Sequence, residues 1–139
     1  MTVGRVVLDT NVLISAVLFG GKPRDVFRLA IQGRIDAFTS PTLNREFREV
    51  LSRPKFKLTA EDCFLIYKEI ETVIMMVFPK ISVTVIRSDT DDNAVLECAL
   101  EARANTIVSG DPHLLDLAEF KDTEIVTPAA FLQNSGCRS

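Results

Sequence analysis

The amino-acid sequence predicts an α/β fold in which a mostly parallel central sheet lies between helices on both faces. Two observations support this fold class. Apolar runs of strand length alternate with longer helical patterns along the chain. The 139 residues are 47% hydrophobic and 25% charged, which suits one domain with its own core. Because helices separate the strands along the chain, right-handed crossovers and mostly parallel strands are expected.

In the first half of the chain, glycine, serine and proline mark where elements begin and end. Glycines follow two apolar helical patterns, as they commonly do at helix ends. Ser40 is a suitable N-cap, and Pro41 stands at the first helical position after it. The expected elements are a buried strand at 5–8, helices at 10–18 and 24–32, a short strand at 36–39 and a helix from 40 to about 52.

In the second half, apolar stripes and β-branched runs define the elements. Thr59 caps a long helix, 59–78, whose stripe includes Cys63, Tyr67 and Ile70. The later elements are a β-branched strand at 82–86, a helix from 90 or 91 to 103, a strand at 106–109, a turn at 110–113, a helical turn at 114–118, a strand at 124–126 and a helical turn at 129–132.

The chain is expected to form one domain over residues 1–133, followed by a frayed tail at 134–139. It shows no signal peptide, and its longest late apolar run, 73–78, is far too short to span a membrane. The chain has three cysteines, Cys63, Cys98 and Cys137, whose spacing matches neither a disulfide framework nor a zinc site. A reducing, cytoplasmic location is therefore expected. Cys63 and Cys98 lie in helical patterns and are expected to be buried thiols.

The formal net charge of −3, taken alone, argues against a protein that binds polyanions. It is the sum of two opposed regions, however. Residues 22–57 contain nine basic and four acidic side chains, whereas residues 89–124 contain ten acidic and two basic ones. The basic region is either a solvated face or a surface for phosphates. The candidates for RNA contact are Lys22, Arg24, Arg45, Arg48, Arg53 and Lys55.

Four carboxylates are expected near the carboxyl ends of the strands, where parallel sheets bind ligands. Asp9 follows the first strand, and Asp111 follows a later strand after one glycine. Asp92 lies in the first turn of its helix, and Glu46 lies in the second turn of another. Because converging carboxylates repel one another, a hard divalent cation, Mg²⁺ or Mn²⁺, is expected among them. Such ions support phosphoryl transfer.

Each acid also has an ordinary structural interpretation. Asp92 suits the dipole at a helix N-terminus, and Asp111 suits a turn in the sequence Ser-Gly-Asp-Pro. Glu46 resembles the exposed glutamates that many helices carry. Asp9 is different, because it closes an apolar run where an unpaired carboxylate would be costly to bury.

Two further features have alternative interpretations. His113, the only histidine, follows Asp111 by two residues and is either a surface residue or a general base. Leu65, Met75 and Met76 lie off the main stripe of the expected helix 59–78. They belong either to the core or to a dimer surface.

Four segments, taken in order, carry a family resemblance: VVLDTNVLIS at 6–15, SP at 40–41 leading to EFREVL at 46–51, DTDDNAVL at 89–96 and TIVSGD at 106–111. Together they resemble a PIN domain, a small metal-dependent nuclease module, over nearly the whole chain. The resemblance implies a PIN-like three-layer sandwich. It implies that Mg²⁺ or Mn²⁺ is held by Asp9, Glu46, Asp92 and Asp111.

The resemblance also implies supporting residues. Thr10 and Asn11 would orient the first carboxylate, and Ser109 stands beside the last one. Asp91 and Asn93 flank Asp92, and either is placed to contribute a ligand through water. Spacing to the apolar stripe of the helix favours Asp92 over Asp91 as the direct ligand.

Within the family, the chain is most similar to VapC-like toxins of toxin–antitoxin pairs. That likeness implies a homodimeric endoribonuclease that hydrolyses RNA phosphodiester bonds with metal-activated water. It also implies a separate antitoxin chain whose tail enters the active-site groove. One alternative is a non-catalytic RNA-binding or scaffolding module of the same fold. Another is a phosphatase with an Asp nucleophile, although Asn11 stands where such enzymes have a second Asp.

Overall fold

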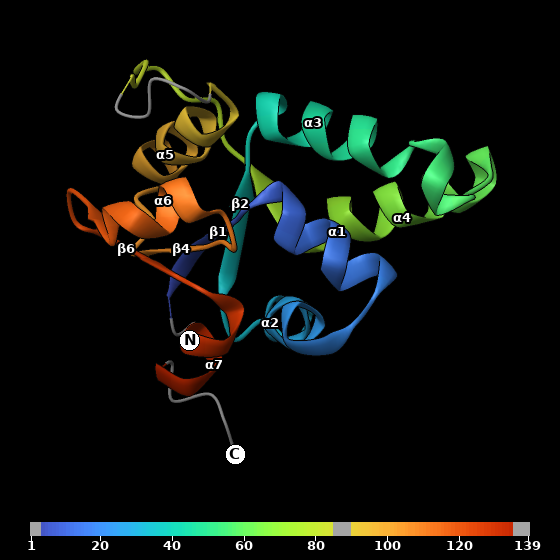
Figure 1. The fold of residues 1–139 in the computed structure, drawn as a ribbon, viewed down its shortest axis with the longest axis horizontal. Coiled ribbons are helices and arrows are strands. Elements are labelled where there is room, and N and C mark those ends of the chain that lie inside the picture. Colours follow the sequence, from blue (N-terminus) through green and yellow to red (C-terminus); the bar gives the residue numbers. More distant parts are fainter. Residues whose placement is uncertain (1–3, 85–89, 135–139) are drawn as a thin grey trace.

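The computed structural model describes residues 4–84 and 90–134, which form a sheet between two layers of helices (Figure 1). The strands are β1 (Arg5–Leu8), β2 (Asp36–Thr39), β3 (Ile74–Met76), β4 (Thr106–Val108), β5 (Glu119–Phe120) and β6 (Thr123–Val126). The helices are α1 (Thr10–Leu18), α2 (Gly21–Ile31), α3 (Pro41–Leu51), the 3-10 helix η1 (Pro54–Phe56), α4 (Ala60–Val73), α5 (Thr90–Ala102), α6 (Pro112–Leu117) and α7 (Pro128–Asn134).

The strand order is β3-β2-β1-β4-β6-β5, and every neighbouring pair is parallel except the antiparallel pair β5–β6. This arrangement confirms the predicted α/β class with a mostly parallel sheet. The chain adds β2 and then β3 on one side of β1, and later returns to place β4 on the other side. The winding therefore reverses between β1 and β4, and ligands bind beyond the carboxyl ends of strands at such a point.

The core consists of two clusters, one on each face of the sheet. Val6 and Leu8 face the cluster formed with α1, α2, α4 and α7, whereas Val7 faces the cluster formed with α5 and α6. Figure 1 shows α5 and α6 on one side of the strands and α1, α2 and α4 on the other. Because successive side chains of a strand point to opposite faces, a strand covered on both sides is apolar throughout. This explains the uninterrupted run Val6-Val7-Leu8.

Two sequence predictions between residues 59 and 86 are wrong. The helix capped by Thr59 ends at Val73, and Ile74–Met76 form β3, where a continued helix was expected. β3 pairs with β2 through the register Phe38↔Met75 and stands at one edge of the sheet, whereas the strand was expected at 82–86. Residues 82–84 have no regular structure, and 85–86 lie outside the described residues. Periodicity alone does not separate a helix end from a strand in a short apolar run.

The other differences are smaller. α2 begins at Gly21, three positions before the expected start, and η1 and β5 were not expected. α6 begins at Pro112 with Asp111 as its cap, where a turn was expected. α7 continues to Asn134, and the rest of the expected tail, 135–139, lies outside the described residues.

Within residues 4–84 and 90–134, no helix is long and apolar enough to cross a membrane. Cys63 and Cys98 are buried free thiols, as predicted. Burial raises the pKa of the Cys98 thiol from 9.0 to about 12, because the thiolate would lose its hydration. Cys137 lies outside the described residues.

Candidate metal centre

Asp9 lies at the carboxyl end of β1, where the chain turns into α1. Its N–H donates a 3.0 Å hydrogen bond to the Val108 carbonyl, so the pairing with β4 continues up to this residue. Asp9 is the N-cap residue of α1, yet its side chain makes no capping hydrogen bond. The residue is only 6% exposed, and Oδ2 accepts a 2.7 Å hydrogen bond from Ser109 Oγ. The buried carboxylate is thus held by the neighbouring strand's end, not by its own helix.

Ser109 follows β4 and connects two of the predicted acids. It is fully buried, and its N–H donates to the Val126 carbonyl. Its hydroxyl donates to Asp9 and also accepts a 2.9 Å hydrogen bond from the N–H of Asp111. Asp111 in turn caps α6, because its Oδ1 accepts a 2.7 Å hydrogen bond from the N–H of His113. One buried hydroxyl therefore fixes the relative positions of two acidic residues.

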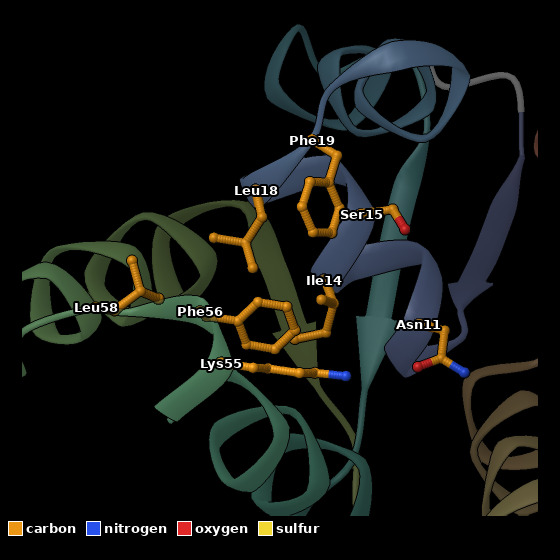
Figure 2. Close-up of a pocket in the computed structure, with 8 residues that line it drawn as sticks. All are labelled: Asn11, Ile14, Ser15, Leu18, Phe19, Lys55, Phe56 and Leu58. Atoms are coloured by element: carbon orange, nitrogen blue, oxygen red, sulfur yellow. The ribbon is translucent and has the colours of Figure 1, made fainter. Parts of the chain in front are cut away.

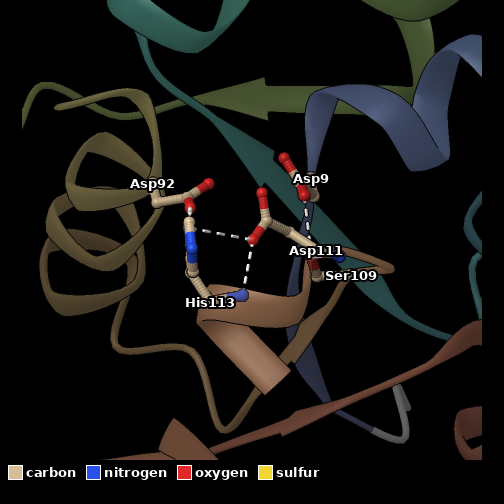
Figure 3. Close-up of polar contacts among 5 residues, drawn as sticks. All are labelled: Asp9, Asp92, Ser109, Asp111 and His113. Atoms are coloured by element: carbon tan, nitrogen blue, oxygen red, sulfur yellow. Dashed lines mark hydrogen bonds and ion pairs between the residues drawn. The ribbon is translucent and has the colours of Figure 1, made fainter. Parts of the chain in front are cut away.

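Asp92 reaches the same place from α5, which lies in the same layer as α6. It is 4% exposed, and its Oδ2 lies 3.8 Å from Nδ1 of His113. The same imidazole nitrogen lies 3.9 Å from Oδ1 of Asp111. Ligand atoms of Asp92, Asp111 and His113 all lie within 4.8 Å of one another. In Figure 3, Asp111 stands between the Asp92–His113 pair and the Asp9–Ser109 pair.

Glu46, on α3, is linked to the site through the residue that follows Asp9. The hydroxyl of the buried Thr10 donates a 2.7 Å hydrogen bond to Oε1 of Glu46. α1 and α3 pack against each other, which brings these two side chains together. Asp9 and Glu46 are not members of the group that lies within 4.8 Å. Asp9 is connected to this group through the Ser109 hydroxyl, which also binds the N–H of Asp111. Glu46 is connected to Asp9 through Thr10, the next residue in the chain.

The supporting residues separate into two sets. Thr10, Ser109 and Asn93 are buried, and Asn93 follows Asp92 directly on α5. Asn11 is exposed and lines a neighbouring cavity beside α1 (Figure 2). The side chain of Asp91 lies outside the described part of the structure. The other residues that line the cavity are Ile14, Ser15, Leu18, Phe19, Lys55, Phe56 and Leu58.

His113 is the site residue that sequence reasoning did not assign. The sequence left it open between a surface residue and a general base, and the structure places its ring beside two of the acids. The available signal was its position two residues after Asp111. An Asp that caps a helix accepts from a main-chain N–H about two residues later, which places that residue's side chain nearby.

The basic residues proposed for RNA contact differ in whether an acidic side chain lies near them. Arg24 lies 3.9 Å from Glu69, and Arg48 lies 3.8 Å from Glu71. Arg48 also lies 4.4 Å from the centre of the Tyr67 ring, and burial raises the pKa of that phenol. Four further candidates are exposed and form no ion pair with the described part of the chain: Lys22, Arg45, Arg53 and Lys55.

The acidic residues fit a hard divalent cation. Asp9 and Asp92 are both more than nine-tenths buried. A carboxylate oxygen of Asp92 lies within 4.8 Å of one of Asp111, and Asp9 is joined to Asp111 through the Ser109 hydroxyl (Figure 3). Carboxylates removed from water and brought near one another are stabilised by a positive ion. Carboxylate oxygens are also the ligands that suit Mg²⁺ and Mn²⁺.

Comparisons with known proteins identify the family and the fold. A family model described as PIN domain matches residues 5–113, a span that contains all four acids. The fold is similar to a solved structure of VapBC2 from Rickettsia felis bound to a DNA fragment from their promoter. The TM-score is 0.63 at 13% sequence identity, and the match covers 87% of this chain and 96% of that one. No match was found among curated proteins.

Proposed function

Because the chain belongs to the PIN domain family, we propose that it is a metal-dependent endoribonuclease and the toxin component of a toxin–antitoxin pair. One observation carries this proposal. The buried Asp92 shares one group of possible ligands with Asp111, and the buried Asp9 is linked to Asp111 through the Ser109 hydroxyl, at the carboxyl ends of β1 and β4. This is the edge of an α/β sheet where ligands bind, at the point where the winding reverses.

The residues that would hold Mg²⁺ or Mn²⁺ are Asp9, Glu46, Asp92 and Asp111. When bound there, the ion supplies activation of water and stabilisation of the charge that develops on phosphate. The chain's own contribution is to fix the carboxylates in advance. Ser109 holds Asp9 in register with Asp111, and Thr10 holds Glu46 beside α1. Such preorganisation lowers the cost of reaching the productive arrangement.

RNA would be held by the exposed basic side chains. Arg45 supports this best, because it is exposed and adjacent to Glu46 on α3. Arg24 and Arg48 belong to the same proposed surface, but each shares its charge with a glutamate of α4. Phosphate contacts of this kind bind RNA without regard to sequence and weaken with salt. The full set is Lys22, Arg24, Arg45, Arg48, Arg53 and Lys55.

Two kinds of protein partner belong to the proposal. The first is a separate antitoxin chain, since a solved structure of similar fold is of VapBC2. The second is another copy of this chain. Leu65, Met75 and Met76 are 62%, 45% and 41% exposed, so they lie outside the core and would be covered in a homodimer. Light scattering of the purified chain would distinguish monomer from dimer.

The proposal also includes a cytoplasmic location.

The direct test is RNA cleavage by the purified chain, freed of any bound partner by denaturation and refolding. We expect cleavage with Mg²⁺ or Mn²⁺, none with EDTA, and loss of at least about 100-fold in Asp9→Asn. Asp116→Asn is the matched control, because Asp116 is an exposed acid on α6 that is not part of the site. A refolded protein that binds no divalent ion and spares all RNA would contradict the proposal.

The same experiment separates the alternatives. Salt-sensitive RNA binding that EDTA does not change, with no cleavage, would favour a non-catalytic RNA-binding or scaffolding module. A trapped acyl-phosphate on Asp9 would favour a phosphatase. The position where phosphatases of that kind have their second Asp is taken by Asn11, which is exposed and lines the neighbouring cavity.

A further inference from the structure

His113 lies beside the carboxylates of Asp92 and Asp111. It is the second residue of α6, and 58% of its side chain is exposed. Its main-chain N–H is bound to Oδ1 of Asp111, which fixes the start of α6 relative to that acid. Figure 3 shows the ring directed toward Asp92, with Asp111 alongside. The backbone contact thus brings the imidazole to the edge of the site.

The distances from the ring indicate what it does there. Nδ1 lies 3.8 Å from Oδ2 of Asp92 and 3.9 Å from Oδ1 of Asp111. Both distances exceed those of N–H···O hydrogen bonds. Two ligand atoms of one octahedral ion, each about 2.1 Å from it, are about 3 Å apart when adjacent and about 4.2 Å apart when opposite. These two separations lie between the limits, and a carboxylate oxygen of Asp92 lies within 4.8 Å of one of Asp111. All three side chains can therefore share one ion after small movements.

We propose that His113 is a metal ligand of this site and that its Nδ1 joins Asp92 and Asp111 on the same divalent ion. The inference rests on the proposed function, since it concerns the same metal centre. An imidazole changes the character of a site formed otherwise by carboxylates. Oxygen ligands suit Mg²⁺, whereas imidazole suits Zn²⁺ and other late first-row ions, with affinity rising from Mn²⁺ onward. His113 therefore shifts the preference of the site from Mg²⁺ toward transition-metal ions.

The first test observes the ring directly. His113 is the only histidine in the chain, so the imidazole signals of a ¹⁵N-labelled sample need no assignment. On titration with Zn²⁺, we expect the Nδ1 resonance to shift and the tautomer protonated at Nε2 to become fixed. On titration with Mn²⁺, we expect the ring signals to broaden. Ring signals that respond to neither ion while the protein binds both would overturn the inference.

The second test compares metal affinities by calorimetry. We expect His113→Gln to weaken binding of Mn²⁺ and Zn²⁺ by about tenfold or more, with a change below about threefold for Mg²⁺. His113→Asp supplies a hard oxygen ligand, so we expect it to retain Mg²⁺ binding and lose the Zn²⁺ preference. Asp116→Asn, on the same helix, is expected to change none of these affinities. Equal weakening for all three ions in His113→Gln would overturn the inference.

The outcomes also distinguish this inference from the proposed function. If the wild-type chain binds no divalent ion, the proposed metal-dependent activity fails together with the inference. If it binds ions that depend on Asp9 but not on His113, only the inference fails. Thermal unfolding of His113→Gln is expected to match that of the wild type, because 58% of the His113 side chain is exposed.

Discussion

The hydroxyl of Ser109 lies 2.7 Å from Oδ2 of Asp9, although the two residues are 100 positions apart in the chain. The sheet register causes this contact. Leu8 is paired with Val108 in the parallel ladder between β1 and β4. Asp9 and Ser109, the residues that follow these two, therefore lie next to each other. A small polar side chain directly after β4 therefore becomes the partner of the acid directly after β1.

Ser109→Ala is predicted to loosen this contact without changing the fold. The substitution removes the donor to Asp9 and the acceptor for the N–H of Asp111. We expect a loss of about 1–3 kcal/mol in the free energy of unfolding, measured by urea denaturation. We also expect Mn²⁺ affinity to fall about 10-fold to 100-fold, measured by calorimetry. Ser52→Ala, which removes an exposed serine hydroxyl, is the control, and equal metal affinity in both variants would contradict the prediction.

Thr10→Val is predicted to affect Glu46 more than it affects the core. Valine has nearly the same shape as threonine, but it lacks the hydroxyl that donates to Oε1 of Glu46. Because Glu46 is half-buried and can recruit water, the free energy of unfolding should fall by only about 1 kcal/mol. Metal affinity should fall about tenfold. Thr10→Ser keeps the hydroxyl and is expected to retain the wild-type affinity, so weakening in both variants would show that Thr10 acts through packing.

The positions of Asp9 and Asp111 could be predicted from the sequence, because the apolar runs before them identify buried strands. The carboxyl ends of parallel strands lie at one edge of the sheet, so the two acids were expected near each other. β3 was not predictable from its own residues. Met75 and Met76 are exposed on an edge strand, so the segment carries no alternation that separates it from the end of α4. Its identity as a strand depends on pairing with β2, which is a property of the whole sheet.

The position of the His113 ring between Asp92 and Asp111 also could not be predicted from the sequence. Its proximity to Asp111 follows from local capping, but its proximity to Asp92 depends on how α5 packs against the sheet. The burial of Asp92 depends on the same packing. Positions fixed by local capping could thus be predicted from the sequence, whereas the contact between α5 and α6 depends on the tertiary structure.

Cys98 is predicted to make stability depend on pH in the alkaline range. Its pKa is about 12 in the fold, because the thiol is fully buried, against 9.0 ordinarily. Between these values the unfolded chain loses the thiol proton while the folded chain keeps it. The stability contributed by the neutral thiol is therefore complete below about pH 9, and it is lost by about 1.4 kcal/mol per pH unit as the pH rises toward 12.

The measurement for Cys98 compares wild type with Cys98→Ala by urea denaturation at several pH values from 8 to 10.5. Other titrating groups are common to both proteins, so the difference between them isolates the thiol. We expect wild type to be the more stable protein at pH 8, since alanine leaves a small cavity. That advantage should shrink as the pH rises above about 9. A difference that stays constant over the range would contradict the burial of this thiol.

Arg45→Ala is predicted to weaken RNA binding more than Arg24→Ala does. Both are arginines of the basic region, but Arg24 lies 3.9 Å from Glu69, whereas Arg45 is exposed on α3 next to the site residue Glu46. An arginine already near a carboxylate has less to gain from a phosphate. In an Asp9→Asn background, which prevents cleavage, fluorescence anisotropy would measure affinity for a labelled RNA at several salt concentrations. We expect Arg45→Ala to reduce the slope of log affinity against log salt by about 1, and Arg24→Ala to leave it nearly unchanged. Equal slopes in the two variants would place the RNA elsewhere on the surface.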